Sequence, residues 1–177
     1  MMRIHIIGPP GSGKTTLAQR LASSLRLPFY DLDYIAWEEG YPGIERPLEI
    51  RLRDILHIAA QPAWITEGVF LTWTDELLSR ADCIVWLDVP LHLVLKHTLS
   101  RRLRSDFGGT IPPTSLLKQL RFLTYIGRYY YSKKCTETRW FTANCLLVHQ
   151  HKLAHCRNLP EIEALLKSIL EQHQAKR

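Results

Sequence analysis

The chain has 177 residues, of which 46% are hydrophobic and 23% charged, and its formal net charge is +6. This composition excludes a disordered, collagen-like or coiled-coil protein, and the length predicts one domain over 1–177. No apolar run approaches the roughly 20 residues that span a bilayer, and the first seven residues do not read as a signal peptide, so we expect a cytoplasmic protein without a membrane partner.

Short apolar runs alternate with amphipathic segments along the chain. The predicted strands cover 3–7, 29–33, 63–70, 83–90 and 145–148. The predicted helices cover 15–25, 48–59, 72–80, 91–104, 114–134 and 160–170. Within the second of these helices the expected apolar face carries Leu48, Leu52, Ile55, Leu56 and Ala59. Alternation of this kind predicts a parallel sheet between layers of helices, with the ligand at the carboxyl ends of the strands.

A glycine-rich segment separates the first strand from the first helix. Residues 8–15 fit the pattern G-x-x-x-x-G-K-[ST], which cradles nucleotide phosphates when it lies between a strand and a helix. The backbone N–H groups would face the phosphates, Lys14 would reach the β- and γ-phosphates, and the Thr15 hydroxyl would bind Mg²⁺. The residues predicted to contact ATP are Gly8, Pro9, Pro10, Gly11, Ser12, Gly13, Lys14, Thr15 and Thr16. The fold class is therefore a three-layer α/β/α P-loop NTPase fold with a five-stranded parallel sheet.

Two acids close the second predicted strand. Asp31 and Asp33 occupy alternate positions, so both carboxylates are expected on one face beside the phosphate loop. One would hold a magnesium-bound water or orient an attacking hydroxyl, and the other would accept a hydrogen bond from the substrate. The alternative is a pair of solvated acids at a strand end.

The third and fourth predicted strands also end near candidate site residues. Glu67 and Gly68 are expected to contact the acceptor substrate, since glycine lets the chain pass close to a ligand. Asp88 lies at the end of the fourth and most apolar predicted strand, where P-loop proteins often carry an acid associated with the metal. The alternative for Asp88 is a cap before Pro90.

A cationic segment follows the fourth strand. Arg101, Arg102 and Arg104 precede a Gly-Gly-Thr loop and predict a helical lid over about 101–139, in which Arg101 and Arg102 neutralise charge during catalysis and Arg104 binds phosphate. Arg128 is a candidate for the acceptor side of the same lid. The alternative is a solvated basic helix face.

Several segments together resemble the bacterial topology modulation proteins, which are P-loop kinases related to adenylate kinase and shikimate kinase. They are the phosphate loop, Tyr-Asp-Leu-Asp at 30–33, Trp-Ile-Thr-Glu-Gly-Val-Phe at 64–70 and Trp-Leu-Asp-Val-Pro at 86–90. The resemblance implies that Asp31 assists Mg²⁺, that Asp33 binds the acceptor, and that Arg157 stacks beside an adenine-binding turn at 158–160. The third strand ends in Glu-Gly-Val-Phe rather than in the glycine run of shikimate kinases, so the acceptor stays open.

The sequence thus predicts a kinase that uses ATP and Mg²⁺ to phosphorylate a nucleotide or another small hydroxyl compound, acting as a monomer or homodimer. The alternative is a nucleic-acid-associated ATPase or regulator connected with DNA topology. The basic charge is compatible with nucleic acid, but no sequence motif supports such a partner.

Overall fold

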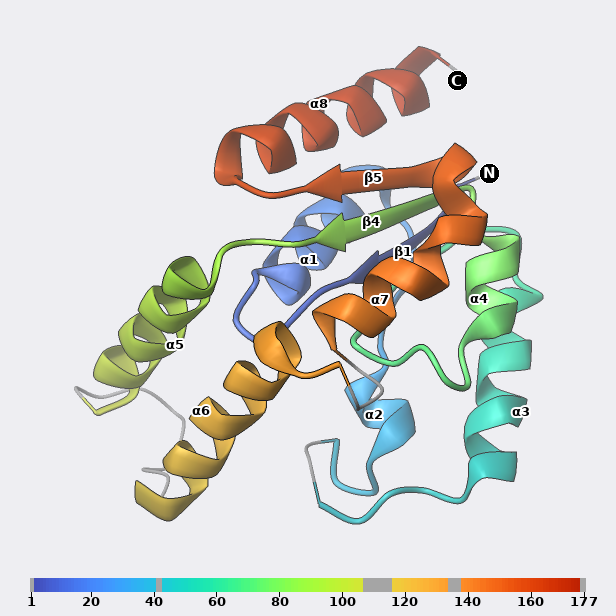
Figure 1. Ribbon diagram of the computed structural model, residues 1–177. Helices are drawn as coiled ribbons and strands as arrows, with labels where there is room; N and C mark the ends of the chain where they lie inside the picture. The colour runs from blue at the N-terminus through green and yellow to red at the C-terminus, as the bar shows by residue number, and fades with distance from the viewer. Residues whose placement is uncertain (1, 41–42, 107–115, 134–137, 176–177) are drawn as a thin grey trace.

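Five parallel strands form one sheet in the order β2-β3-β1-β4-β5 in the computed structural model (Figure 1). The structure describes residues 2–40, 43–106, 116–133 and 138–175, apart from the side chains of 101–106, 116–121 and 175. The strands are β1 Arg3–Ile7, β2 Phe29–Asp31, β3 Trp64–Gly68, β4 Cys83–Leu87 and β5 Leu153–Cys156. In β1, Ile6 is in register with Glu67 on one side and Val85 on the other, so β1 is central.

Helices connect the strands and cover both faces of the sheet. The helices are α1 Lys14–Leu25, α2 Asp33–Ala36, α3 Leu48–Ala59, α4 Asp75–Arg80, α5 Leu91–Asp106, α6 Leu116–Tyr131, α7 Arg139–Leu146, the 3₁₀ helix η1 Leu147–Lys152 and α8 Leu159–Ala175. This arrangement confirms the predicted three-layer α/β/α fold. Figure 1 shows α5 and α6 beyond the arrowheads of the strands, at the end of the sheet where ligands bind in such folds.

The two faces of the sheet bury separate hydrophobic clusters. Ile4 and Ile6 pack with Leu21 of α1 and Leu166 of α8, whereas Ile7 belongs to the cluster that α3, α4 and α7 cover. Successive strand residues point to opposite faces, so one apolar strand supplies both clusters. Each fully buried aliphatic side chain contributes about 1.5–3 kcal/mol, which makes β1 a rigid support for the loop that follows it.

The last strand lies later in the chain than predicted. Residues 145–148, the expected strand, form the end of α7 and the start of η1, and Leu147 and Val148 are 57% and 75% exposed. The strand is instead Leu153–Cys156, in which Ala154 pairs with Val85 of β4. The prediction was wrong because periodicity alone cannot separate a short apolar strand from the end of a helix.

The apolar face of α3 also differs from the prediction. Ile55, Ile58 and Ala59 are buried, whereas Leu52 and Leu56 are 39% and 54% exposed. The buried positions follow the spacing of three and four residues that places side chains on one helical stripe.

Among the described residues, no helix combines the length and the apolar character that crossing a membrane requires.

Candidate active site

The glycine-rich loop joins β1 to α1 at the carboxyl end of the central strand. Gly11 and Gly13 have φ angles of 80° and 94°, values that side-chain-bearing residues rarely adopt. A Cβ on Gly8 would lie 2.7 Å from the Leu87 carbonyl oxygen, so glycine is also needed there for close packing against β4. The N-cap of α1, Gly13, provides no side-chain hydrogen bond to the helix. The first N–H groups of α1 therefore suit an anionic ligand, and the loop fits a nucleotide phosphate.

The residues that follow the loop contact a carboxylate from β3. The Thr15 hydroxyl donates a 2.6 Å hydrogen bond to Glu67 Oε1, and Lys14 Nζ lies 3.9 Å from Glu67 Oε2. Lys14 Nζ also donates to the Pro9 carbonyl oxygen at 3.2 Å. Side-chain exposure is 11% for Lys14 and 5% for Glu67, so this pair lies in a largely desolvated setting. The loop lysine and threonine are thus held in place by one buried acid.

Glu67 lies in an environment that disfavours its charge. Burial raises the pKa of Glu67, and the nearby carboxylates of Asp31 and Asp33 raise it further, whereas Lys14 and the Thr15 hydrogen bond lower it. The carboxylates of Asp31, Asp33 and Glu67 are therefore close enough to repel one another at the same edge of the sheet. A cation at this edge, such as Mg²⁺ with a nucleotide, would relieve the repulsion among them.

Asp31 and Asp33 meet through a turn and not through the expected alternation on a strand. β2 ends at Asp31, Leu32 has helical φ and ψ angles, and Asp33 begins α2. Asp31 Oδ1 accepts a 2.9 Å hydrogen bond from the Asp33 backbone N–H, a typical way for an aspartate to close a turn. Leu32 still donates to the Glu67 carbonyl oxygen at 2.9 Å, which fixes this turn beside β3.

Gly68 is required where β3 passes Leu32. A Cβ on Gly68 would lie 3.0 Å from Leu32 Cβ, so the absent side chain permits close packing between two protein segments. The predicted approach of Gly68 to a substrate remains a separate prediction. The described contacts give the glycine a packing role between β3 and the start of α2.

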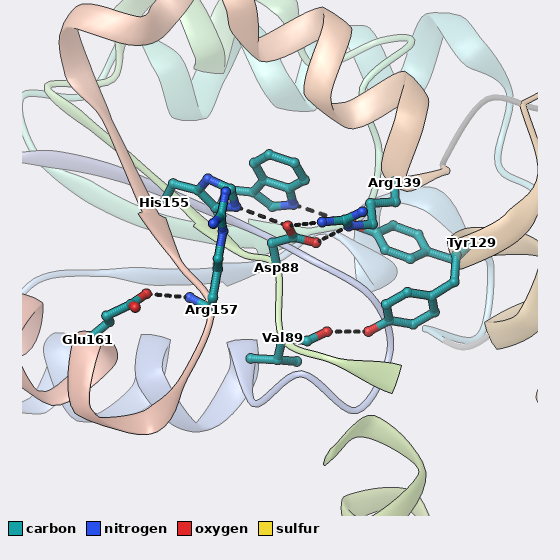
Figure 2. Close-up of polar contacts among 9 residues, drawn as sticks. Asp88, Val89, Tyr129, Arg139, His155, Arg157 and Glu161 are labelled. Carbon is teal, nitrogen blue, oxygen red and sulfur yellow. Dashed lines mark hydrogen bonds and ion pairs between the residues drawn. The ribbon is translucent and has the colours of Figure 1, made fainter. Parts of the chain in front are cut away.

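Asp88 is enclosed by partners from the last third of the chain. Arg139 donates Nε to Asp88 Oδ1 at 2.6 Å and Nη2 to Oδ2 at 2.8 Å, and His155 Nε2 lies 3.0 Å from Oδ2 (Figure 2). The His155 ring stacks on Trp86, with ring centroids 4.3 Å apart. The structure thus brings Glu67, and not Asp88, to the Thr15 hydroxyl. A metal role for Asp88 stays a prediction, and it would require displacement of Arg139 or His155.

The Asp88 cluster could not be read from sequence spacing. Arg139 and His155 follow Asp88 by 51 and 67 positions, and no local motif joins them. The packing of α7 and β5 against β4 brings them together. A buried aspartate directly after an apolar strand was the one available signal that a cationic partner was needed.

The structure describes the side chain of only one of the four arginines predicted to act in the lid, Arg128. The backbone of Arg101, Arg102 and Arg104 belongs to α5, but their side chains fall outside the described part of the structure. Arg128 is an exposed residue of α6. Just before the predicted lid, α5 packs on the phosphate loop: a Cβ on Gly11 would lie 2.8 Å from Thr98 Oγ1, and His97 Nδ1 lies 3.1 Å from the Gly11 carbonyl oxygen.

Arg157 lies between β5 and α8. Its backbone N–H donates to Glu161 Oε2 at 2.6 Å, and Asn158 Oδ1 accepts from the Glu161 N–H at 3.0 Å. These reciprocal bonds cap α8 and fix the turn. The Arg157 residue itself is exposed, so stacking of its side chain on adenine stays a prediction.

Binding of Mg²⁺ at this site is a prediction from the sequence. Within the described ranges, no three His, Cys, Asp or Glu side chains gather in a way that could hold a metal ion by themselves. Mg²⁺ usually keeps several waters and binds one or two protein ligands together with substrate phosphates. Thr15 and Asp31 stay the predicted members of such a partial ligand set.

The loop, its lysine and the parallel sheet define a P-loop phosphotransferase. A family model described as "ATPase family associated with various cellular activities (AAA)" matches residues 4–88. A shikimate kinase of Corynebacterium diphtheriae is 32% identical over 121 residues, which are 62% of this chain and 69% of that protein. The chain belongs to the shikimate kinase family.

Solved structures share the fold at low sequence identity. Shikimate kinase from Acinetobacter baumannii in complex with shikimate has a TM-score of 0.54 and 18% identity, over 100% of this chain and 95% of that chain. A gluconokinase from Sinorhizobium meliloti has a TM-score of 0.52 and 14% identity, over 99% of this chain and 97% of that chain. The finer resemblance to topology modulation proteins stays a prediction.

Proposed function

We propose that this protein transfers the γ-phosphoryl group of ATP to a hydroxyl group of a small molecule. The observation that carries the proposal is the contact of Glu67 with both Lys14 and Thr15, at the edge of the sheet where Asp31 and Asp33 also lie. A phosphate cradle beside several carboxylates supplies the charges that phosphoryl transfer to a hydroxyl needs. The related shikimate kinase and the structurally similar gluconokinase also carry the names of small-molecule kinases.

The proposed reaction balances as one substitution at phosphorus. The acceptor oxygen forms a bond to the γ-phosphorus, the bond from that phosphorus to the β–γ bridging oxygen breaks, and ADP leaves. The acceptor hydroxyl proton passes to Asp33, the acid at the start of α2. Lys14 neutralises charge on the transferred group, while Thr15 and Asp31 would hold Mg²⁺, which screens the phosphates.

The phosphate-binding role of Lys14 and the acceptor role of Asp33 can be separated by experiment. ADP release would be measured with ATP, Mg²⁺ and a panel of nucleosides, nucleoside monophosphates and small hydroxy acids. Lys14→Ala should weaken ATP binding and lower turnover with every acceptor by about 100-fold or more. Asp33→Asn should lower turnover by a similar factor and leave ATP binding close to that of the wild type.

Two matched substitutions serve as controls because they lie away from the phosphate loop. Lys167, on α8, has a side chain that is 78% exposed, and Asp82 lies before β4, at the opposite end of the sheet from the loop. Lys167→Ala and Asp82→Asn should therefore keep wild-type turnover. If ATP binds with normal affinity and no hydroxyl compound raises ADP release, the small-molecule kinase is wrong and a nucleotide-dependent regulator replaces it.

A further inference from the structure

The middle of helix α5 lies against the phosphate loop at Gly11. A Cβ on Gly11 would lie 2.8 Å from Thr98 Oγ1 and 3.2 Å from the Val94 carbonyl oxygen, so α5 reaches the loop backbone where the loop has no side chain. Val94 is fully buried in this contact region. His97, on the same stretch of α5, places Nδ1 3.1 Å from the Gly11 carbonyl oxygen. The helix therefore contacts the loop through close packing and through one polar side chain.

His97 is the donor in this hydrogen bond. A carbonyl oxygen can only accept, so Nδ1 carries a proton, either in the neutral Nδ1–H tautomer or in the imidazolium form. The bond is thus available in both protonation states of the ring. His97 is half-buried, and a hydrogen bond shielded in this way competes less with water. The ring therefore fixes the direction in which the Gly11 carbonyl group points.

The peptide group between Gly11 and Ser12 is held at both of its polar atoms. Its oxygen accepts from His97, and its N–H, that of Ser12, donates to the Pro9 carbonyl oxygen at 3.1 Å. The Pro9 carbonyl oxygen also accepts from Lys14 Nζ at 3.2 Å. Because a peptide unit is planar, the direction of its carbonyl group also sets the direction of its N–H. A chain of hydrogen bonds thus links His97 on α5 to Lys14 in the loop.

The residues on either side of this peptide do little to hold it. Gly11 has a φ angle of 80°, and glycine changes between backbone conformations more easily than other residues. Ser12 Oγ is buried and has no hydrogen-bond partner among the described residues. A carbonyl oxygen turned into the ring of N–H groups that the loop presents would repel phosphate oxygens. While His97 holds the Gly11 carbonyl oxygen against α5, that rotation is prevented.

We propose that His97 is a positioning residue for the phosphate loop, which it keeps in the form that binds a triphosphate by holding the Gly11 carbonyl oxygen. In this role His97 does not touch the reacting atoms. The inference rests on binding of ATP to the loop, as the proposed function does, but not on the transfer step or the acceptor. Arg101 follows His97 by four positions in α5, about 6 Å along the helix axis. One helix therefore positions the loop and carries the first predicted lid arginine.

Binding of two ligands without any acceptor tests this role. Isothermal titration calorimetry would measure the affinity for ATP and for inorganic tripolyphosphate, each with Mg²⁺. Tripolyphosphate has no base or sugar, so it reports on the phosphate loop alone. His97→Leu removes the donor and should weaken binding of both ligands by about 10-fold, the scale of one hydrogen bond. His97→Asn should restore most of the affinity, because its amide nitrogen can take the place of Nδ1 and donate the same bond.

A matched variant and a measurement without ligand separate positioning from folding. His92 is an exposed residue in the first turn of α5, so His92→Leu should bind both ligands like the wild type. Thermal melting would verify that each variant is folded. Amide hydrogen exchange of Ser12 would follow the loop directly in the absence of nucleotide. His97→Leu should speed this exchange by about 10-fold, and His97→Asn should keep it close to the wild-type rate.

The outcomes separate this inference from the kinase proposal. Wild-type binding of both ligands by His97→Leu, together with unchanged exchange of Ser12, would overturn the positioning role. Weaker binding of ATP with unchanged binding of tripolyphosphate would also overturn it, because His97 would then act on the base or the sugar. If both ligands bind more weakly to His97→Leu and no hydroxyl compound accepts phosphate from ATP, the positioning role stands and only the kinase proposal fails.

Discussion

Glu67 and Asp88 are two carboxylates on either side of the central strand with very different surroundings. Each residue is 4% exposed, and each lies at the carboxyl end of a strand that pairs with β1. Glu67 contacts Lys14 and Thr15 of the phosphate loop, whereas Asp88 is bound by Arg139 and His155 from the end of the chain. Position in the sheet therefore does not decide which contacts either acid makes. Those contacts depend on the partners that distant segments of the chain supply.

The largest effect is expected from Glu67→Gln, which removes the charge beside the phosphate loop. Turnover should fall by about 100-fold, because Lys14 and Thr15 lose the anion that positions them. The stability effect has the opposite sign. Because the pKa of Glu67 is raised in the folded protein, ionisation of Glu67 above the unfolded pKa lowers the free energy of unfolding. Glutamine does not ionise, so the substitution removes this destabilisation.

Glu67→Gln should therefore melt at a higher temperature than the wild type at pH 7.5 in the absence of nucleotide. Steady-state ADP release and differential scanning calorimetry measure the two effects. A variant that is as active as the wild type would show that Glu67 is a packing residue, and the contrast with Asp88 would disappear.

His5 provides a pH test of the strand between the two acids. The ring is fully buried, Nδ1 lies 2.8 Å from Thr66 Oγ1, and burial lowers the pKa of His5 to about 4. The folded protein accommodates the neutral ring more favourably than the protonated ring. The contribution of His5 to the free energy of unfolding is therefore fully present above the unfolded pKa near 6.5 and is lost as the pH falls toward 4. The loss should reach about 3 kcal/mol.

Urea unfolding of the wild type and His5→Leu between pH 7.5 and pH 4 measures this loss as a difference in pH dependence. The pH dependence of His57→Gln, an exposed position on α3, should match that of the wild type. Equal pH dependence in the wild type and His5→Leu would mean that His5 does not resist protonation.

Arg139→Ala tests whether the Asp88 cluster stabilises the fold. Removing Arg139 leaves the Asp88 side chain, which is 1% exposed, with His155 as the remaining side-chain partner that the described residues provide. We expect a loss of about 2 kcal/mol, which is below the usual cost of breaking a buried pair because Arg139 is itself half exposed. Arg80→Ala, which breaks a more exposed pair with Glu76, should cost about 0.5 kcal/mol or less. Equal costs in chemical denaturation would contradict a structural role for Asp88.

The smallest effect is expected from Tyr130→Phe. The Tyr130 hydroxyl donates a 2.6 Å hydrogen bond to the carbonyl oxygen of Val89, the residue directly after Asp88. Its loss should cost about 1 kcal/mol, the usual net value of one such bond. Tyr131→Phe is the matched control, because Tyr131 is 77% exposed. Thermal melting of both variants would measure the two stability changes. A destabilisation confined to Tyr131→Phe would contradict the expected result.

Local sequence patterns predicted much of the fold. The phosphate loop was predictable because its glycines, lysine and threonine lie within the single short segment 8–15. Gly11 and Gly13 adopt the positive φ angles that the motif requires. The central strands were predictable because strands buried on both faces read as continuous apolar runs. The fifth strand was not, since its residues Leu153–Cys156 include a polar histidine whose partner, Asp88, directly follows another strand, β4.

The phosphate loop, the alternation of strands and helices, and the acids near the strand ends thus follow from local sequence. The contact of Glu67 with Thr15, the enclosure of Asp88 by Arg139 and His155, and a cavity beside Trp37, Phe70 and Trp73 follow from the packing of distant segments. The two groups differ in the range of the interactions that produce them. Backbone conformation and periodicity act over a few neighbouring residues, whereas desolvated charges and aromatic surfaces are matched by partners that only the packing of the sheet and its helices brings together.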